Sequence, residues 1–91
     1  MEYVITFKNT SIAIKAEKRL LEKAINAGVL PLPSQISAGC GICLRVSPDE
    51  IKSALEALTN IDEIGLYTRV MENGRFSYSE LQDWRSLWSE S

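Results

Sequence analysis

Histidine is absent from this chain of 91 residues, and cysteine occurs only twice. Without histidine the chain lacks the commonest general base in catalysis and the commonest neutral ligand of metal ions. The hydroxyls of Thr10, Ser11 and Ser37 therefore have no imidazole to activate them. Two cysteines do not supply the four ligands of a structural zinc site. We expect no metal and no cofactor, and the thiols of Cys40 and Cys43 are the best candidates for any chemistry.

Long apolar runs and blocks of like charge are also missing. No run approaches the ~20 residues that cross a bilayer. Residues 1–4 do not begin a basic segment followed by an apolar one, so they do not resemble a signal peptide. The net charge is −2 with both signs interspersed, whereas a nucleic-acid partner favours a basic face. We therefore expect a cytoplasmic protein with reduced thiols and without a membrane or nucleic-acid partner.

The length and composition are those of one ordinary globular domain. Hydrophobic residues make up 45% of the chain and charged residues 24%. A chain of this length forms a single domain with a modest core. We expect the core in residues 1–71, followed by a turn and an amphipathic C-terminal helix in residues 72–91.

Patterns of apolar and turn-forming residues predict the order strand, helix, strand, strand, helix, strand, helix. The first six elements are expected at residues 2–7, 12–25, 29–36, 42–46, 51–58 and 64–71. Ser77-x-x-Glu80 can cap the last helix, which would carry Leu81, Trp84 and Trp88 along one stripe. We expect this stripe to pack on the sheet face that the other two helices leave uncovered, or on a second subunit.

Several residues mark where the helices begin and end. Asn9 or Thr10 can accept a hydrogen bond from the first turn of the first helix. Gly28 fits the left-handed residue that ends it. Ser47 and Glu50 flank Pro48 in the pattern of a capping box before the second helix.

This order of elements predicts an α+β, ferredoxin-like βαββαβ two-layer sandwich with an extra C-terminal helix. Right-handed crossovers give an antiparallel sheet with the strands in the order 4-1-3-2. The second strand then lies at an edge. Pro31 and Pro33 agree with that place, because proline donates no hydrogen bond to a neighbouring strand.

The fold predicts the surroundings of Cys40. The turn between the second and third strands lies at the end of the sheet where the first helix begins, so Cys40 should lie near Lys8, Asn9 and Thr10. The helix N-terminus and the lysine favour a thiolate over a thiol. Gly39 and Gly41 should leave the sulfur open to approach. The alternative is a plain tight hairpin in which Cys40 only packs.

The other two candidates in this segment are Cys43 and Arg45. Cys40 and Cys43 form a Cys-x-x-Cys pattern, but in an extended strand their Cα atoms would be ~10 Å apart, beyond the reach of a disulfide. A turn across the pair would be needed, and Cys43 otherwise fills space in the strand. Arg45 shares the sheet face of Cys43 and is a possible contact for an anion; the alternative is an exposed strand arginine.

Three segments resemble a known family: Phe7-Lys8-Asn9-Thr10, Ala13-x-x-Ala16-Glu17 and Pro31-x-Pro33-x-x-Ile36-Ser37-x-x-Cys40-Gly41-x-x-Leu44-Arg45. Over about residues 3–70 the chain is similar to the small bacterial and archaeal domain of unknown function labelled putative selenium/sulfur carrier protein-like. The resemblance implies that Cys40 carries sulfur or selenium as a persulfide or selenosulfide. The family pattern has arginine in place of Ser34, so a contact of that arginine with an anionic group would be lacking here. It has a small residue in place of Cys43, which directs the mechanism to Cys40 alone.

The leading hypothesis is therefore a thiol-based carrier that accepts a sulfur or selenium atom on Cys40 from a donor protein and passes it to an acceptor protein. A second hypothesis is a non-catalytic interaction module, including a homodimer, in which Cys40 is incidental. A third is a small oxidoreductase that uses Cys40 and Cys43 as a redox pair.

Overall fold

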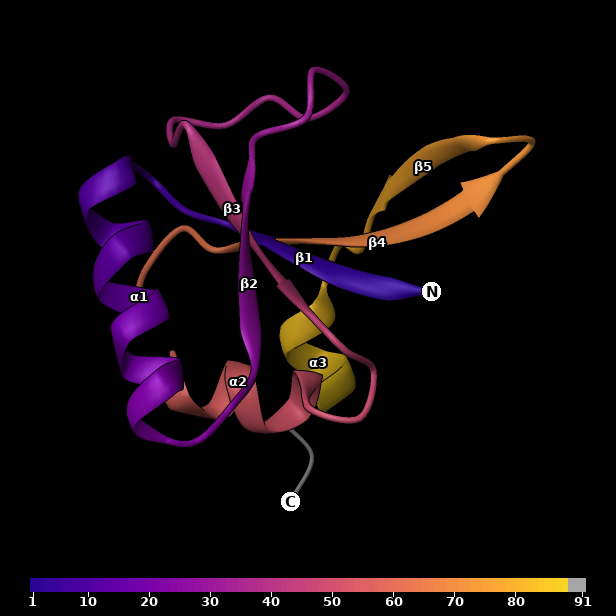
Figure 1. The fold of residues 1–91 in the computed structure, drawn as a ribbon. Helices are drawn as coiled ribbons and strands as arrows, with labels where there is room; N and C mark the ends of the chain where they lie inside the picture. The colour runs from indigo at the N-terminus through magenta and orange to yellow at the C-terminus, as the bar shows by residue number, and fades with distance from the viewer. Residues whose placement is uncertain (89–91) are drawn as a thin grey trace.

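The computed structural model describes the backbone of residues 1–88 and the side chains of residues 1–86. In this part of the chain the elements are β1 (Glu2–Thr6), α1 (Thr10–Glu22), β2 (Ala27–Pro31), β3 (Ile42–Val46), α2 (Ile51–Ala57), β4 (Gly65–Glu72), β5 (Arg75–Glu80) and α3 (Trp84–Trp88). The strands form one antiparallel sheet in the order β2-β3-β1-β4-β5. The helices are short, and the β4–β5 hairpin projects from the body of the molecule (Figure 1).

The predicted ferredoxin-like sandwich with sheet order 4-1-3-2 is wrong. The sheet has five strands, because β5 pairs with β4 in a tight hairpin with Glu72 opposite Arg75. The turn is Asn73-Gly74, and both residues have positive φ (50° and 78°), as two-residue hairpin turns require. The predicted cap residues Ser77 and Glu80 therefore lie in a strand, and the last helix begins only at Trp84.

The last helix does not cover the bare face of the sheet, contrary to expectation. Leu81 and Trp84 pack against the main core on the side of α1 and α2, and Figure 1 shows α3 beside α2. The side chain of Trp88 lies outside the described residues. The opposite face is covered in part by the loop of residues 32–41, whose Ile36 is 5% exposed and packs on Val4 and Cys43.

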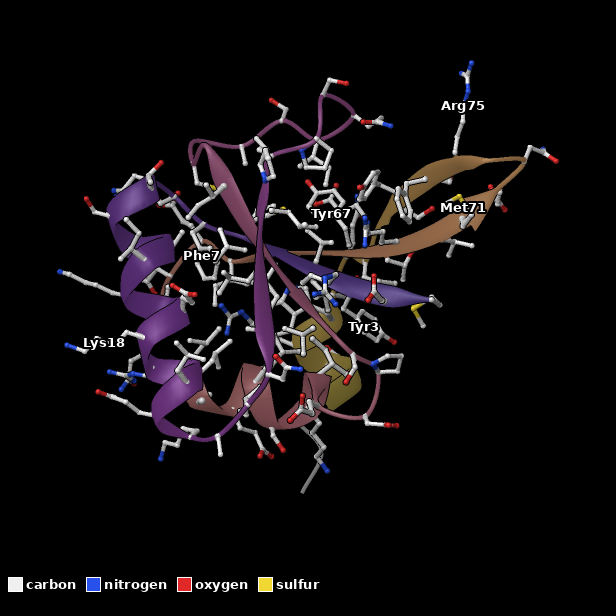
Figure 2. All side chains as sticks on the ribbon, viewed as in Figure 1. Tyr3, Phe7, Lys18, Tyr67, Met71 and Arg75 are labelled. Carbon is white, nitrogen blue, oxygen red and sulfur yellow. The ribbon has the colours of Figure 1, made fainter. Side chains whose placement is uncertain are left out.

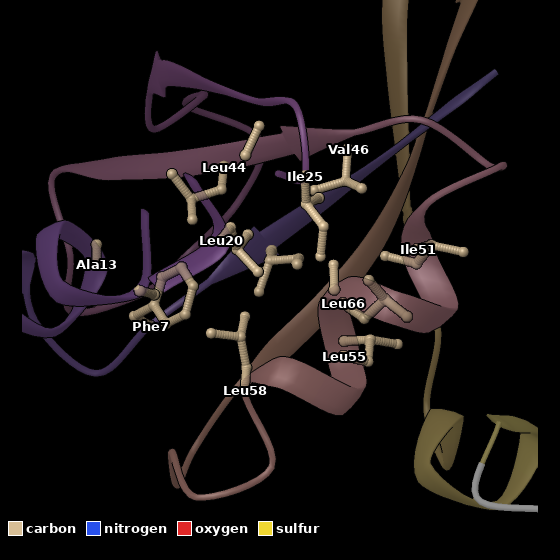
Figure 3. Close-up of a cluster of buried hydrophobic side chains, with 14 of the residues drawn as sticks. Phe7, Ala13, Leu20, Ile25, Leu44, Val46, Ile51, Leu55, Leu58 and Leu66 are labelled. Atoms are coloured by element: carbon tan, nitrogen blue, oxygen red, sulfur yellow. The ribbon is translucent and has the colours of Figure 1, made fainter. Parts of the chain in front are cut away.

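The main core lies between the sheet and the helices. Phe7 follows β1, Leu44 and Val46 come from β3, Leu66 comes from β4, and Leu20 of α1 packs on them (Figure 3). Each of these side chains is fully buried. Burying a side chain of this size stabilises a fold by about 1.5–3 kcal/mol. This packing holds α1 against the sheet and so places the turn that precedes it.

Two of the predicted helix boundaries need correction. Asn9 caps α1 as predicted, since its Oδ1 accepts a hydrogen bond from Ile12 N at 2.9 Å. Gly28 does not end this helix: the residue with positive φ is Ala24 (61°), and Gly28 lies in β2, where a Cβ would collide with the guanidinium of Arg45. The predicted capping box before α2 is not formed, because Glu50 accepts a hydrogen bond from Asn26 N at 3.2 Å.

The proline-bearing strand β2 lies at an edge of the sheet, as predicted. Pro31 ends it opposite Ile42, and Leu32 N continues the pairing with a hydrogen bond to Gly41 O at 3.1 Å. This bond closes the base of the 32–41 loop and brings Cys40 back toward the sheet. Within the described residues no helix has the length and apolar character needed to span a membrane.

Candidate functional site

The 32–41 loop meets the turn between β1 and α1 through three close contacts. Phe7 N donates a hydrogen bond to Cys40 Sγ at 3.3 Å. Gly41 N donates one to Thr10 Oγ1 at 2.9 Å. Between them, Gly39 lies so close to the carbonyl oxygen of Lys8 that an added Cβ would collide with it. The predicted proximity of the Cys40 segment to the start of α1 is therefore confirmed.

The prediction that the sulfur of Cys40 is open to approach is wrong. Cys40 is only 3% exposed and belongs to the main hydrophobic core. Gly39 allows the loop to lie against the β1–α1 turn, and this close contact directs the side chain of Cys40 inward. Within the described residues, the sulfur of Cys40 accepts a hydrogen bond from the backbone N–H of Phe7. The site is thus a buried sulfur with a hydrogen-bond donor.

Lys8, predicted to supply positive charge for the thiol, is paired elsewhere. Its Nζ lies 3.9 Å from Glu63 Oε2, and both side chains are mostly exposed. The carboxylate of Glu63 therefore offsets the positive charge of Lys8 that was predicted to lie beside Cys40. Asn9 serves as the cap of α1. The roles of Lys8, Asn9, Thr10, Gly39 and Gly41 at a reactive thiol stay predictions.

Cys43 is a packed thiol on the opposite face of the sheet. It is fully buried with Val4 and Ile36, and its Sγ lies 3.9 Å from Pro31 O. Burial raises the pKa of Cys43 to about 11; the charge of Cys40 adds to this effect, and the charge of Arg69 opposes it. Cys43 therefore stays protonated near neutral pH, which makes it a poor nucleophile. Both cysteines are free thiols.

Arg45, predicted as a possible anion contact, is bonded within the protein. Glu2 accepts hydrogen bonds from Arg45 Nη1 at 2.9 Å and Arg69 Nη1 at 2.6 Å, and Arg69 Nε also donates to the hydroxyl of Tyr78 at 3.2 Å. The guanidinium of Arg69 lies 3.6 Å from the ring centroid of Phe76. Arg45 is thus the end of a polar network across the bare face, not a free cation.

The other members of this network, Glu2, Arg69 and Tyr78, were not predicted from the sequence. Burial raises the pKa of Glu2, but the hydrogen bonds and charges of Arg45 and Arg69 outweigh burial and hold it below its ordinary value. Burial lowers the pKa of Arg69, while Tyr78 and Glu2 raise it more, and the net shift is upward. Both groups are therefore charged near neutral pH. Finding them from sequence would have required the register of β1, β3 and β4.

A pocket lies beside the Cys40 loop. Its volume is about 450 Å³. The lining includes Thr6, Gly65 and Tyr67 of the sheet and residues 37–39 of the loop. It also includes Lys8, which follows β1, and Glu63, which precedes β4. Figure 2 shows Tyr67 beneath the loop. Among the described residues, no group of three His, Cys, Asp or Glu is arranged to hold a metal ion.

The fold and site define a small α+β domain in which a buried, hydrogen-bonded cysteine of the loop before β3 lies beside the start of α1. The chain belongs to the family described as Putative Se/S carrier protein-like, which matches residues 2–68. The match includes Cys40 and Cys43 and ends within β4, so β5 and α3 lie outside it. No curated protein and no solved structure matches the chain.

Proposed function

We propose that the protein carries one sulfur or selenium atom on Cys40, as a persulfide or selenosulfide. The family description supports a carrier of this kind. The observation that directs the proposal to Cys40 is the hydrogen bond from Phe7 N to its sulfur, because a sulfur that changes charge during transfer benefits from a fixed donor. The described residues place no such donor at Cys43, whose thiol instead lies 3.9 Å from Pro31 O, and its raised pKa keeps the proton on near neutral pH.

Loading is a nucleophilic displacement that needs no metal or oxidant. The thiolate of Cys40 attacks the outer sulfur of a donor persulfide, R–S–SH, and forms a new S–S bond. The S–S bond of the donor breaks, and the donor leaves as R–S⁻ while Cys40 becomes Cys40–S–SH. Discharge is the same step in reverse, with an acceptor thiolate as the nucleophile. One sulfur atom moves and the redox balance is unchanged; a selenium atom takes the same route.

Burial of Cys40 gives the carrier a protected state. The outer atom of a persulfide is reactive toward thiols and oxidants, so a carrier needs to shield it between donor and acceptor. Loading and discharge then require the 32–41 loop to lift. Ile36 opposes this movement, and exposing it costs about 1.5–3 kcal/mol. An opening of this cost leaves the loop closed most of the time and open in a small fraction of molecules.

Mass spectrometry of the intact protein after incubation with a small persulfide donor tests the proposal. We expect the wild type and the Cys43→Ser variant to gain the mass of one sulfur atom, and the Cys40→Ser variant to gain none. Peptide mapping should place the added atom on Cys40. Retention on Cys43, or no retention in a correctly folded wild type, would overturn the proposal. Cys40→Ala, which puts no hydroxyl into the core, checks that the serine variant is not simply unfolded.

A second candidate function is a protein-interaction module, and one observation favours it. The edge strand β5 carries neither proline nor lysine, whereas the other edge strand, β2, ends in Pro31. Met71 and Phe76 on the same hairpin are 55% and 38% exposed. If interaction is the function, Cys40→Ala should leave complexes intact and Phe76→Ser should weaken them, as measured by analytical ultracentrifugation. The redox-pair hypothesis gains no support from a protonated Cys43.

A further inference from the structure

The pocket beside the Cys40 loop has a polar floor. Thr6 and Gly65, which face each other across β1 and β4, both line it. Thr6 is only 4% exposed, yet within the described chain its hydroxyl forms no hydrogen bond and is not sealed from solvent. A Cβ on residue 65 would collide with Thr6 Oγ1, so the glycine leaves room for this hydroxyl. The floor of the pocket thus includes a hydroxyl group that has no hydrogen-bond partner among the described residues.

The rim of the pocket carries one charge of each sign. Lys8 Nζ and Glu63 Oε2 are 3.9 Å apart, with 60% and 64% of the side chains exposed. Exposed ion pairs of this kind contribute only about 0–1 kcal/mol, so a ligand can replace the contact at little cost. A simple anion would be repelled by Glu63, and a simple cation by Lys8. A ligand with both a carboxylate and an ammonium group satisfies both residues.

The position of the pocket relates it to the two thiols. Gly39, in its wall, directly precedes Cys40, and Phe7, also in the lining, donates the hydrogen bond to the sulfur of Cys40. On the floor, continuing the β1–β3 register from Ile5 opposite Leu44 places Thr6 opposite Cys43. A volume of about 450 Å³ lies within the range of small-molecule sites. A small ligand held here lies against the segment that has to lift for loading.

We propose that this pocket binds a free α-amino acid with a sulfur- or selenium-bearing side chain, cysteine persulfide or its selenium analogue, as the small-molecule donor of the cargo. This inference rests on the proposed carrier function. Lys8 binds the carboxylate, Glu63 binds the ammonium group, and the hydroxyl of Thr6 bonds the ligand from the floor. The side chain is directed to the wall of residues 37–39. When the loop lifts, the Cys40 thiolate takes the outer sulfur, and cysteine leaves as its thiolate.

Isothermal titration with L-cysteine, kept reduced by a phosphine, tests the binding step. Cysteamine lacks the carboxylate and 3-mercaptopropionate lacks the ammonium group, so each of them engages only one of the two charges. We expect L-cysteine to bind at least tenfold more tightly than either compound. Equal binding of the three compounds, or no binding of L-cysteine, would overturn the proposal.

Variants of the lining residues assign the site. Lys8→Met, Glu63→Gln and Thr6→Val should each weaken L-cysteine binding by about tenfold or more, which corresponds to about 1.4 kcal/mol. Lys15→Met is the matched control, because Lys15 lines the neighbouring groove along α1 and not this pocket. An equal loss in Lys15→Met would overturn the assignment. Near-UV circular dichroism confirms that each variant is folded.

The Cys40→Ser variant separates this inference from the proposed function. It should bind L-cysteine as the wild type does, and it should acquire no sulfur from cysteine persulfide. Sulfur retained on wild-type Cys40 without any binding of L-cysteine would overturn the donor pocket and leave the carrier function standing. Binding of L-cysteine without sulfur retention on Cys40 from any donor would overturn the carrier function, while the amino-acid site stands.

Discussion

Gly39 lies against the carbonyl oxygen of Lys8, with no room between them for a methyl group. Gly41, on the other side of Cys40, has more space, because a Cβ there would be 3.6 Å from Thr10 Oγ1, an ordinary van der Waals contact. The two glycines that flank the cysteine are therefore different in kind. The first is required by the contact between the loop and the β1–α1 turn, and the second is not.

Gly39→Ala should lift the loop from this turn. The added methyl group meets backbone, which cannot move as a flexible side chain does, and overpacking of this type costs about 1–3 kcal/mol. Alkylation of Cys40, followed by mass spectrometry, should become faster, and urea denaturation should show the loss of stability. Gly41→Ala is the matched control and should change both measurements little. Similar effects of the two substitutions would contradict this account of the loop.

Thr10→Val should loosen the same loop without adding volume. It removes the oxygen that accepts the hydrogen bond from Gly41 N, a bond worth about 0.5–1.5 kcal/mol. If the loop opens to expose Cys40, the rate of its alkylation should rise by a factor of about two to ten. Thr59→Val, in the turn after α2, is the matched control and should leave the rate unchanged. An unchanged rate in Thr10→Val would mean that Cys40 is reached by another movement.

The adjacency of Cys40 to the start of α1 was predictable, whereas the direction of its side chain was not. The two segments are neighbours because the turn before β3 and the start of α1 lie at the same end of the sheet. Local sequence patterns predict the order of strands and helices up to Cys40, and this order is enough to place both segments at that end. The direction of one side chain depends on how closely two backbones approach. Gly39 and Gly41 predicted an open sulfur because glycine leaves space; here the β1–α1 turn fills the space beside Gly39, and the sulfur points into the core.

The missed strand β5 has a different cause. Ser77-x-x-Glu80 fits a helix cap, and the same residues alternate across a strand. The two-residue turn at Asn73-Gly74 decides between these possibilities, because it returns the chain directly onto β4. The Glu2 network was missed for another reason: its partners Arg45 and Arg69 are 43 and 67 residues away along the chain, and they meet Glu2 only through the register of the sheet.

The raised pKa of Cys43 predicts a loss of stability in alkaline solution. The ordinary thiol ionises near 9.0, and the folded thiol near 11, so the folded state holds its proton more tightly. The contribution to stability is complete below pH 9 and is lost as the pH rises toward 11. Between pH 8 and pH 10 the wild type should lose about 1 kcal/mol relative to Cys43→Ala, measured by urea denaturation. If the difference in free energy of unfolding between the two proteins stayed constant from pH 8 to pH 10, burial would not be raising the pKa of Cys43.

The Glu2 network predicts the opposite dependence, at acid pH. Arg45 and Arg69 hold the pKa of Glu2 below its ordinary value of 4.5, so the folded state favours the carboxylate. Glu2 therefore stabilises the fold above pH 4.5, and this contribution is lost as the pH falls through the lowered value. Glu2→Gln should cost about 1 kcal/mol near pH 7, and the difference from the wild type should shrink as the pH falls below 4.5. Thermal unfolding across this range measures it.

The matched control for this last substitution is Glu72→Gln. Glu72 lies at the end of β4 and is exposed, and exposed charges of this kind change stability little. Because Arg69 also stacks on Phe76 and bonds Tyr78, loss of Glu2 should loosen the whole β4–β5 hairpin, and amide hydrogen exchange should quicken in residues 69–78. A loss of stability in Glu2→Gln that does not change with pH, or exchange unchanged in the hairpin, would mean that the two arginines hold this face of the sheet without their carboxylate partner.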